Sequence, residues 1–243
     1  MFLLTPILRR LLYLAIFVGL LAVGAELVAR KLVGDAVSHA VASRIGASAK
    51  VSFGSTPLVE QIVRGSLSDV SVHADDARIG GLGPLRIEGT LRDVHLRSLT
   101  GLQGAIGSLD VHAGASPAVV LGMLATRACA QSLPADVRAG LTAAPRVAIF
   151  PGRVDLLPPS GRAAEVQLRP YASGSDLRFE ISAVELGGAP APAAALLAAR
   201  TGSRCERTLS DLPFGVSLVS ARAVDGSLAL SFAGRDASFS AIG

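Results

Sequence analysis

Aromatic side chains are scarce in this chain, and tryptophan is absent. Phe, Tyr and Trp together make up 4% of the 243 residues. This scarcity argues against a protein that binds single strands of nucleic acid by stacking bases on aromatic rings. Charge is also low, because only 17% of the residues are charged, and the net charge of +4 is scattered without a basic cluster. We therefore predict no nucleic-acid partner.

Signatures of catalysis and of cofactor binding are missing as well. The chain contains no GxSxG, HExxH, CxxC, GxGxxG or GxxxxGK[ST] pattern. One group of titratable residues, His73 with Asp75 and Asp76, lies at an expected strand end, but consecutive strand residues point to opposite faces. We therefore predict no enzyme, no cofactor and no metal site. A hydrolase with an unrecognised site is the least favoured alternative.

The N-terminus carries the clearest targeting signal. Arg9 and Arg10 precede an uninterrupted apolar run, Leu11–Ala25, which ends at Glu26. Positive charge before a short apolar core is typical of a secretory signal, and the small side chain of Ala25 suits cleavage after it. The alternative is an uncleaved anchor that keeps the two arginines in the cytoplasm. Both interpretations place the rest of the chain outside the cytoplasm, either secreted or anchored to the membrane.

The exported part is expected to be a single domain. Residues 1–25 form the signal peptide or anchor, and residues 26–243 contain neither a charge-rich linker nor a short repeat. The chain has two cysteines, Cys129 and Cys205. An even number of cysteines in an exported protein favours a disulfide, although two separate buried thiols remain an alternative.

Helical patterns occur at several places in the chain. Directly after the export segment, apolar residues recur at spacings of three and four residues, which predicts an amphipathic helix that ends near Gly46. Its apolar positions are Val33, Ala36, Val37, Ala40, Val41 and Ile45. We also predict a helical turn at 57–63, helices over 117–130 and 135–141, and over 189–202 a proline-rich entry into an alanine-rich helix.

Most of the remaining chain alternates apolar and polar residues with the period of a β-strand. The alternation slips by one residue after Leu91, after Ile181 and after Phe232. A β-bulge compensates for such a slip and bends the strand, whereas a strand end is the alternative explanation. With Asp225-Gly226 as a hairpin turn, the pattern predicts an α+β protein. We expect a long, strongly curved antiparallel β-sheet wrapped around the N-terminal amphipathic helix.

A curved apolar sheet covered by a helix encloses a trough, and an incompletely filled trough suits an acyl chain. The chain is therefore expected to bind an acyl-chain lipid, and to contact the membrane through its N-terminal segment. The candidate lining residues are Val33, Val37, Val41, Val70, Val72, Leu85, Ile87, Leu177 and Phe179. The same residues suit an ordinary core, so a structural or interaction module with a packed interior is the alternative.

Two segments of the chain resemble a known family. They are "IVRGSLSDVSVHADDARIGGL" (62–82) and "DLPFGVSLVSARAVDGSLALSFAGRDASF" (211–239). These look like the LmeA-like phospholipid-binding proteins of actinobacterial cell envelopes, which share the Val-x-Val strand, the Ala-Asp-Asp turn and the Leu-Pro-Phe-Gly segment. The family's aromatic residues before the first short helix are missing here, where the chain reads "FGSTPLVEQIV". The resemblance implies a non-enzymatic, envelope-located protein that binds phospholipid and has a tubular fold, in which a long curved antiparallel sheet is rolled around a helix.

Overall fold

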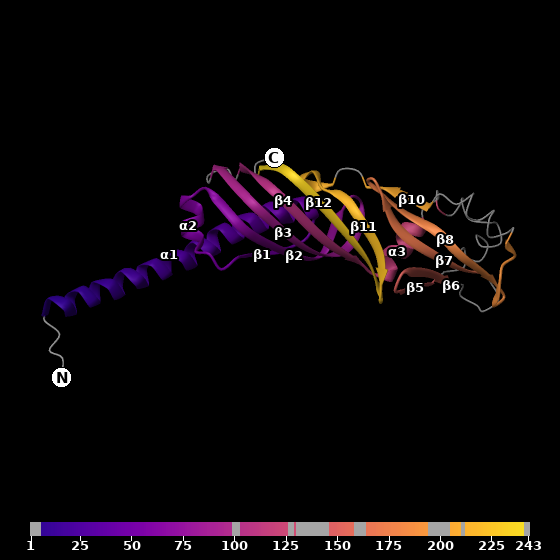
Figure 1. Ribbon diagram of the computed structural model, residues 1–243, viewed down its shortest axis with the longest axis horizontal. Helices are drawn as coiled ribbons and strands as arrows, with labels where there is room; N and C mark the ends of the chain where they lie inside the picture. Colours follow the sequence, from indigo (N-terminus) through magenta and orange to yellow (C-terminus); the bar gives the residue numbers. More distant parts are fainter. Residues whose placement is uncertain are drawn as a thin grey trace, which may run out of the picture.

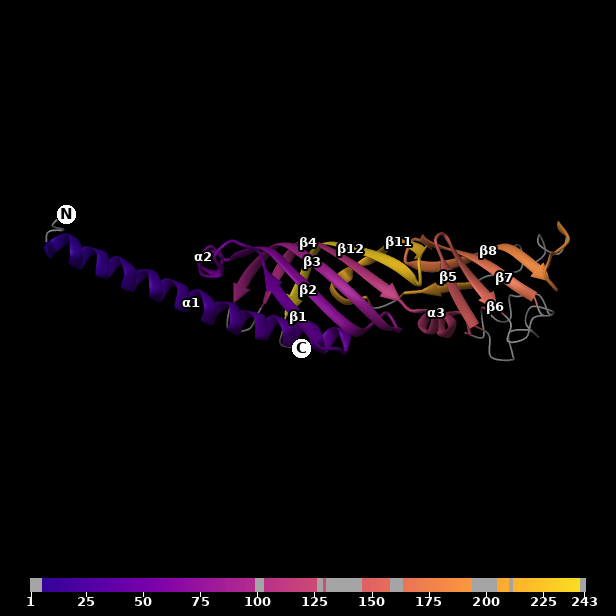
Figure 2. The same ribbon diagram turned by 90° about the horizontal axis from the view of Figure 1, so that it is seen from below.

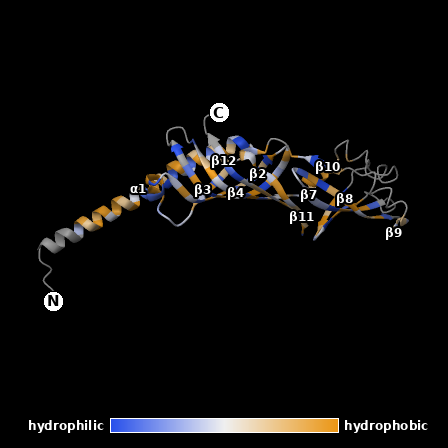
Figure 3. Ribbon diagram, turned by 45° about the horizontal axis from the view of Figure 1, so that its top comes forward, coloured by the Kyte–Doolittle hydropathy of each residue, from blue (hydrophilic) through white to orange (hydrophobic). Residues whose placement is uncertain are grey.

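A long N-terminal helix leads into the body of the protein. The computed structural model describes residues 6–98, 103–125, 129, 146–157, 164–193, 205–209 and 212–240. Helix α1 (Pro6–Ile45) is 40 residues long, and its N-terminal part projects from the elongated body (Figure 1). The segment Tyr13–Ile45 is long and apolar enough to cross a membrane, and its projecting part is coloured mainly as hydrophobic (Figure 3). The predicted amphipathic helix is therefore the C-terminal part of α1 and continues the export segment without a break.

The first sheet is antiparallel and has the strand order β1-β2-β3-β4-β12-β11. Its strands are β1 (Ala49–Phe53), β2 (Ser66–Ile79), β3 (Leu82–Ser98), β4 (Gln103–Ala115), β11 (Ser217–Val224) and β12 (Ser227–Ser240). The predicted hairpin turn at Asp225-Gly226 is confirmed, because Val224 pairs with Ser227 across it. Gly80 and Gly81 form the turn between β2 and β3 with φ of 55° and 73°, a left-handed conformation that glycine adopts without a steric penalty.

The second sheet lies at the end of the body away from the projecting helix (Figure 2). Its strands are β5 (Arg146–Phe150), β6 (Arg153–Leu157), β7 (Ala164–Ser173), β8 (Asp176–Leu186), β9 (Ala189–Pro190) and β10 (Cys205–Thr208). Two backbone hydrogen bonds tie the sheets together. The N–H of Gly152 donates to the Ala223 carbonyl at 2.9 Å, and that of Gly226 to the Ile149 carbonyl at 3.1 Å. One continuous apolar core therefore extends through both sheets.

Three short helices complete the described part of the chain, and they test several of the helix predictions. These are α2 (Leu58–Val63), α3 (Pro117–Leu124) and the 3₁₀-helix η1 (Pro213–Gly215). The helical turn expected at 57–63 is confirmed. The helix expected over 117–130 ends earlier, at Leu124. In the stretch 189–202, Ala189 and Pro190 of the predicted proline-rich entry pair with β8, and the chain is helical at Ala193. Residues 135–141 and 194–202 lie outside the described residues.

The three phase slips lie inside continuous strands, where the alternation of buried and exposed residues shifts by one position. In the first sheet they share one row, because Gly107 of β4 lies opposite Asp93 on one side and opposite Asp236 on the other, between the paired residues of the flanking rows. Both aspartates have left-handed φ angles, 54° and 51°. Aliphatic residues on both sides of this Asp93–Gly107–Asp236 row are buried, for example Leu109 and Ile106. The pairing register is the same on both sides of the row, so no strand gains an extra residue there. The row therefore changes the buried face of several strands together without a β-bulge, and it keeps the apolar residues in the core.

The slip in β8, in contrast, is a β-bulge. The register between β7 and β8 shifts between Gln167 and Leu168, so β8 carries one extra residue at that level. The hydroxyl of Ser182 donates to the carbonyl of Gln167 at 3.0 Å. Val184 then returns to the buried face that Ile181 also occupies. The β-bulge interpretation is therefore confirmed for the slip in β8. It is wrong for the two slips in the first sheet, where the register does not shift. The strand-end alternative is wrong for all three, because each slip lies inside a continuous strand.

The class of the fold is confirmed, but the predicted wrapping is not. The strands form antiparallel sheets after one long N-terminal helix, as an α+β fold requires. The described residues form two sheets instead of one, and neither is closed or strongly curled. Helix α1 packs mainly against the edge strand β1, where the hydroxyl of Ser38 donates to the carbonyl of Ala49.

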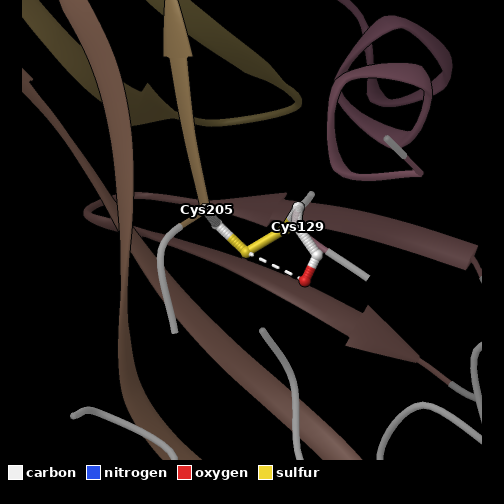
Figure 4. Close-up of a disulfide and its surroundings, with 2 residues drawn as sticks. All are labelled: Cys129 and Cys205. Atoms are coloured by element: carbon white, nitrogen blue, oxygen red, sulfur yellow. Dashed lines mark hydrogen bonds between the residues drawn. A yellow bond between two sulfur atoms is a disulfide. The ribbon is translucent and has the colours of Figure 1, made fainter. Parts of the chain in front are cut away.

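A disulfide joins two distant parts of the chain. Cys129, which follows α3, is bonded to Cys205 at the start of β10, 76 residues later in the sequence (Figure 4). Both residues are buried, with exposed fractions of 3% and 4%. The bond therefore ties the segment after α3 to an edge of the second sheet.

Candidate functional site

An apolar crevice lies between the end of α1 and η1. Its floor is the face of the first sheet formed by β2, β3, β4 and β12, and its walls are the last turns of α1 and the segment 213–216. The lining residues are Val41, Ile45, Val72, Ile79, Ile87, Gly89, Leu91, Leu109, Val111, Pro213, Phe214, Val216 and Phe232. Every lining side chain is apolar or is that of glycine, so the crevice suits hydrocarbon and offers no side chain to bind a polar headgroup.

The crevice is narrow in this structure. Its volume is about 50 Å³, whereas pockets that hold whole small ligands measure roughly 300–1,000 Å³. A chain of many methylenes therefore fits only if one wall moves away from the floor. The walls belong to α1 and η1, which are not strands of the sheet that forms the floor. Such a movement would leave the hydrogen bonds between the floor strands intact.

The wall formed by η1 has an unusual backbone. Phe214 has φ of 58° in the middle of the Leu-Pro-Phe-Gly segment, and Gly215 follows with φ of 64°. A bulky non-glycine residue in the left-handed region is strained by about 1–3 kcal/mol, and such strain often marks functional segments. Gly234 of β12 lies directly beneath, where an added Cβ would be 3.1 Å from Cγ1 of Val216. The absence of a side chain at Gly234 therefore allows this wall to rest on the sheet.

The predicted lining residues separate into two groups in the structure. Val41, Val72 and Ile87 line the crevice. The others lie elsewhere: Val33 and Val37 are half-buried on α1, Val70 and Leu85 are buried in the first sheet, and Leu177 and Phe179 are buried in the second sheet. Sequence reasoning missed Phe214 and Phe232, although the Leu-Pro-Phe-Gly segment was already one of the motifs behind the family resemblance.

The polar residues that the sequence singled out form an exposed ion-pair cluster. Nε of Arg86 lies 3.1 Å from Asp75 Oδ1, and Nε2 of His73 lies 3.5 Å from Asp75 Oδ2. The hydrogen bond from Arg86 holds the pKa of Asp75 below its usual range. Asp76 has φ of 60° in a bulge of β2. Within the described ranges, no three His, Cys, Asp or Glu residues are placed to hold a metal ion.

Arginines that could meet an anionic lipid headgroup already have carboxylate partners. Arg169 pairs with Glu180 at 3.6 Å. Arg178 pairs with Asp176 at 3.3 Å and with Glu206 at 3.4 Å. These contacts favour a solubilising role for the two arginines on the outer surface of the second sheet.

One carboxylate in the second sheet is buried. Asp155 is 2% exposed, and its Oδ2 lies 3.2 Å from Nε of Arg153. Its Oδ1 has no hydrogen-bond partner among the described residues. Burial raises the pKa of Asp155, with Arg153 opposing and Glu185 adding to the increase. Glu165 stands directly opposite Glu185 on the neighbouring strand, and burial and these carboxylates raise its pKa too.

Replacing Asp155 by asparagine is expected to stabilise the protein at neutral pH. Because the pKa of Asp155 is raised by folding, its charged form costs stability at pH values above that pKa, and protonation removes the cost as the pH falls. We expect Asp155→Asn to raise the unfolding free energy by about 1 kcal/mol at pH 7. This difference should shrink as the pH falls to about 4, as chemical denaturation at several pH values would show. Glu180→Gln, which alters an exposed pair, is the control and should change stability little.

Comparison with known proteins agrees with the apolar character of the crevice. No curated protein and no solved structure matches the chain. A family model, described as LmeA-like phospholipid-binding, matches residues 24–233, which include α1 from Gly24 onward, η1, the second sheet and the first sheet as far as Ala233 of β12. The match covers most of the 243 residues. The chain belongs to the LmeA-like phospholipid-binding family.

Proposed function

We propose that this protein binds phospholipid without catalysing a reaction, and that the crevice holds an acyl chain. The observation that carries the proposal is the wholly apolar lining contributed by α1, the first sheet and η1. Burial of each methylene is worth about 0.8 kcal/mol, so part of a fatty tail is enough to offset a modest displacement of one wall. The headgroup would stay outside, because the lining offers it no polar partner.

The N-terminal helix and the disulfide support the proposed location. An apolar N-terminal helix and a bond between two cysteines both fit a protein that works outside the cytoplasm. We propose that residues 26–243 form one exported domain of the cell envelope, secreted or anchored through residues 1–25. There it would support the assembly of envelope lipids or lipoglycans. The tubular arrangement belongs to the same proposal, with the lipid-bound sheet curling further around α1 and the acyl chain.

The small volume of the crevice favours a second candidate function. A cavity of about 50 Å³ is also what an ordinary packed core leaves between side chains. In that case the protein is a structural or interaction module of the envelope and needs no ligand. The two candidates differ in one measurable respect, which is whether filling the crevice changes lipid binding.

Filling the crevice at Gly89 separates the two candidates. Gly89 is in the floor, and a Cβ there would meet Cγ2 of Val111 at an ordinary 3.6 Å. We expect Gly89→Val to lower the phospholipid-bound fraction by about fivefold, because it removes space that an acyl chain needs. Native mass spectrometry of the full chain, purified in mild detergent and exposed to phospholipid, would measure this fraction.

Matched variants control this experiment. Gly114→Val adds the same side chain to the same sheet, at a position where a Cβ meets nothing within 4 Å. It should leave lipid binding unchanged. Gly89→Ala should give an intermediate loss, and thermal melting would show that all three variants are folded. Equal lipid-bound fractions for Gly89→Val and the unmodified protein would contradict the acyl-chain site and support the packed module.

A further inference from the structure

A second apolar hollow lies where α1 leaves the body. It has a volume of about 690 Å³ and lies between α1 and α2. We call it the α1–α2 wedge. Its lining residues are Ala22, Val23, Ala25, Glu26 and Leu27 of α1, with Pro57, Val59, Glu60, Val63 and Arg64 of the segment around α2. The wedge is far larger than the crevice, and most of its lining is aliphatic.

Polar contacts fix α2 at one level of α1. The Glu26 carboxylate accepts hydrogen bonds from the backbone N–H groups of Leu58 at 2.7 Å and Val59 at 3.0 Å. Nε of Arg30 donates to the same carboxylate at 2.7 Å, and its Nη2 donates to the carbonyl of Gly54 at 3.3 Å. The start of α2 is therefore held beside Glu26.

This level coincides with the outer boundary of a bilayer that α1 would cross. A hydrocarbon core of about 30 Å needs about 20 helical residues, because each residue adds about 1.5 Å. Counted from Arg10, which stays on the cytoplasmic side when the N-terminal segment is an anchor, 20 residues end at Arg30. Glu26 is one helical turn before that residue. Helix α2, held beside Glu26, then lies at the junction of acyl chains and headgroups.

The side chains of α2 suit this position. Val59 and Val63 are four residues apart on one face, and Val63 is 82% exposed. On another face, Arg64 pairs with Glu60 at 2.6 Å. A short helix with one apolar and one charged face is the pattern of an element that lies in the membrane interface. Figure 1 shows α2 at the end of the body from which α1 projects, so no part of the described body separates it from the membrane.

Exposed aliphatic residues lie along α1 as far as the expected bilayer boundary at Arg30 and just beyond it. Leu20 is 66% exposed, Leu27 is 64% exposed and Leu32 is 65% exposed. Side chains of this kind suit a lipid environment. Lys31 is exposed one residue beyond Arg30, at the expected depth of the headgroups, where basic residues attract anionic lipids.

We propose that α2 is a second membrane-contact element, and that the α1–α2 wedge takes an acyl chain of a phospholipid in the outer leaflet. This proposal rests on the proposed membrane anchor and deepens the proposed lipid binding, because it locates where the body meets its lipid source. The wedge needs both helices, so it also requires that residues 1–25 stay attached to the mature protein.

Depth-dependent quenching in vesicles tests the proposal. The full chain with Val63→Cys carries an environment-sensitive fluorophore, while the native cysteines remain in their disulfide. It is inserted into vesicles of phosphatidylcholine and phosphatidylglycerol that contain spin-labelled acyl chains. We expect the fluorophore at position 63 to be quenched about threefold more than the same label on Val219→Cys. Val219 is a matched control, because it is a 60% exposed valine on β11, distant from the wedge.

The outcomes are distinct from those of the crevice experiment. Equal quenching at positions 63 and 219 would overturn the membrane contact of α2. An intact mass that lacks residues 1–25 would overturn it as well. Adding Gly89→Val should leave the quenching at position 63 unchanged, whereas Val63→Glu should abolish lipid contact at the wedge without filling the crevice. If the membrane contact of α2 is overturned, the acyl-chain site in the crevice is unaffected. If the acyl-chain site in the crevice is overturned, the membrane contact of α2 is unaffected.

Discussion

Replacing both Cys129 and Cys205 by serine is expected to lower the unfolding free energy by about 4 kcal/mol. The disulfide closes a loop with a sequence separation of 76 residues, and removing it restores that freedom to the unfolded chain. Both cysteines are buried, so the serine hydroxyls also lose hydration in the folded state. Because the chain has no tryptophan, far-UV circular dichroism during chemical denaturation is the suitable measurement.

Reduction provides the control for this variant. A reducing agent should destabilise the unmodified protein by a similar amount and should leave the double serine variant unaffected. If the variant unfolds at the same denaturant concentration as the oxidised protein, the disulfide does not restrain the unfolded chain as described.

The second large effect is expected at Gly107. This glycine lies between two aspartates with left-handed φ angles, Asp93 and Asp236, in neighbouring strands. A Cβ at Gly107 would lie 2.9 Å from Cβ of Asp93, a contact that requires the backbone to shift. We therefore expect Gly107→Ala to lower the unfolding free energy by about 2–4 kcal/mol.

Two further variants show whether the Asp93–Gly107–Asp236 row is the cause. Gly114→Ala, in the same strand but with nothing within 4 Å of the added Cβ, should change the unfolding free energy by less than about 1 kcal/mol. Asp93→Gly should be neutral or stabilising, because glycine adopts the left-handed conformation more easily than aspartate. Similar losses for Gly107→Ala and Gly114→Ala would show that the row does not constrain the sheet.

Local patterns in the sequence are enough to predict the strands but not their arrangement. The slip between Leu91 and Val94 is visible because alternation within a strand depends only on neighbouring residues. That Asp93 and Asp236 flank the same glycine depends on pairings between distant strands, which periodicity does not report. For the same reason, the pattern around Leu177 and Phe179 resembles that of the first sheet, although these residues belong to a second sheet.

The candidate site was predictable to a similar degree. Val41, Val72 and Ile87 follow from the helical and strand periods that place them on apolar faces. Phe214 does not, because its position depends on a left-handed backbone within η1 and on close contact with Gly234. The α1–α2 wedge depends on the long-range hydrogen bonds of Glu26, which no local pattern indicates.

The most direct test of the acyl-chain site is cross-linking with a phospholipid that carries a photoactivatable group near the end of one acyl chain. After irradiation of the full chain, peptide mass spectrometry would identify the labelled residues. The account predicts saturable labelling of the crevice walls, at Val41, Ile45 and Phe214, and its loss in Gly89→Val. Labelling confined to the second sheet around Leu177 and Phe179, or no saturable labelling at all, would contradict it.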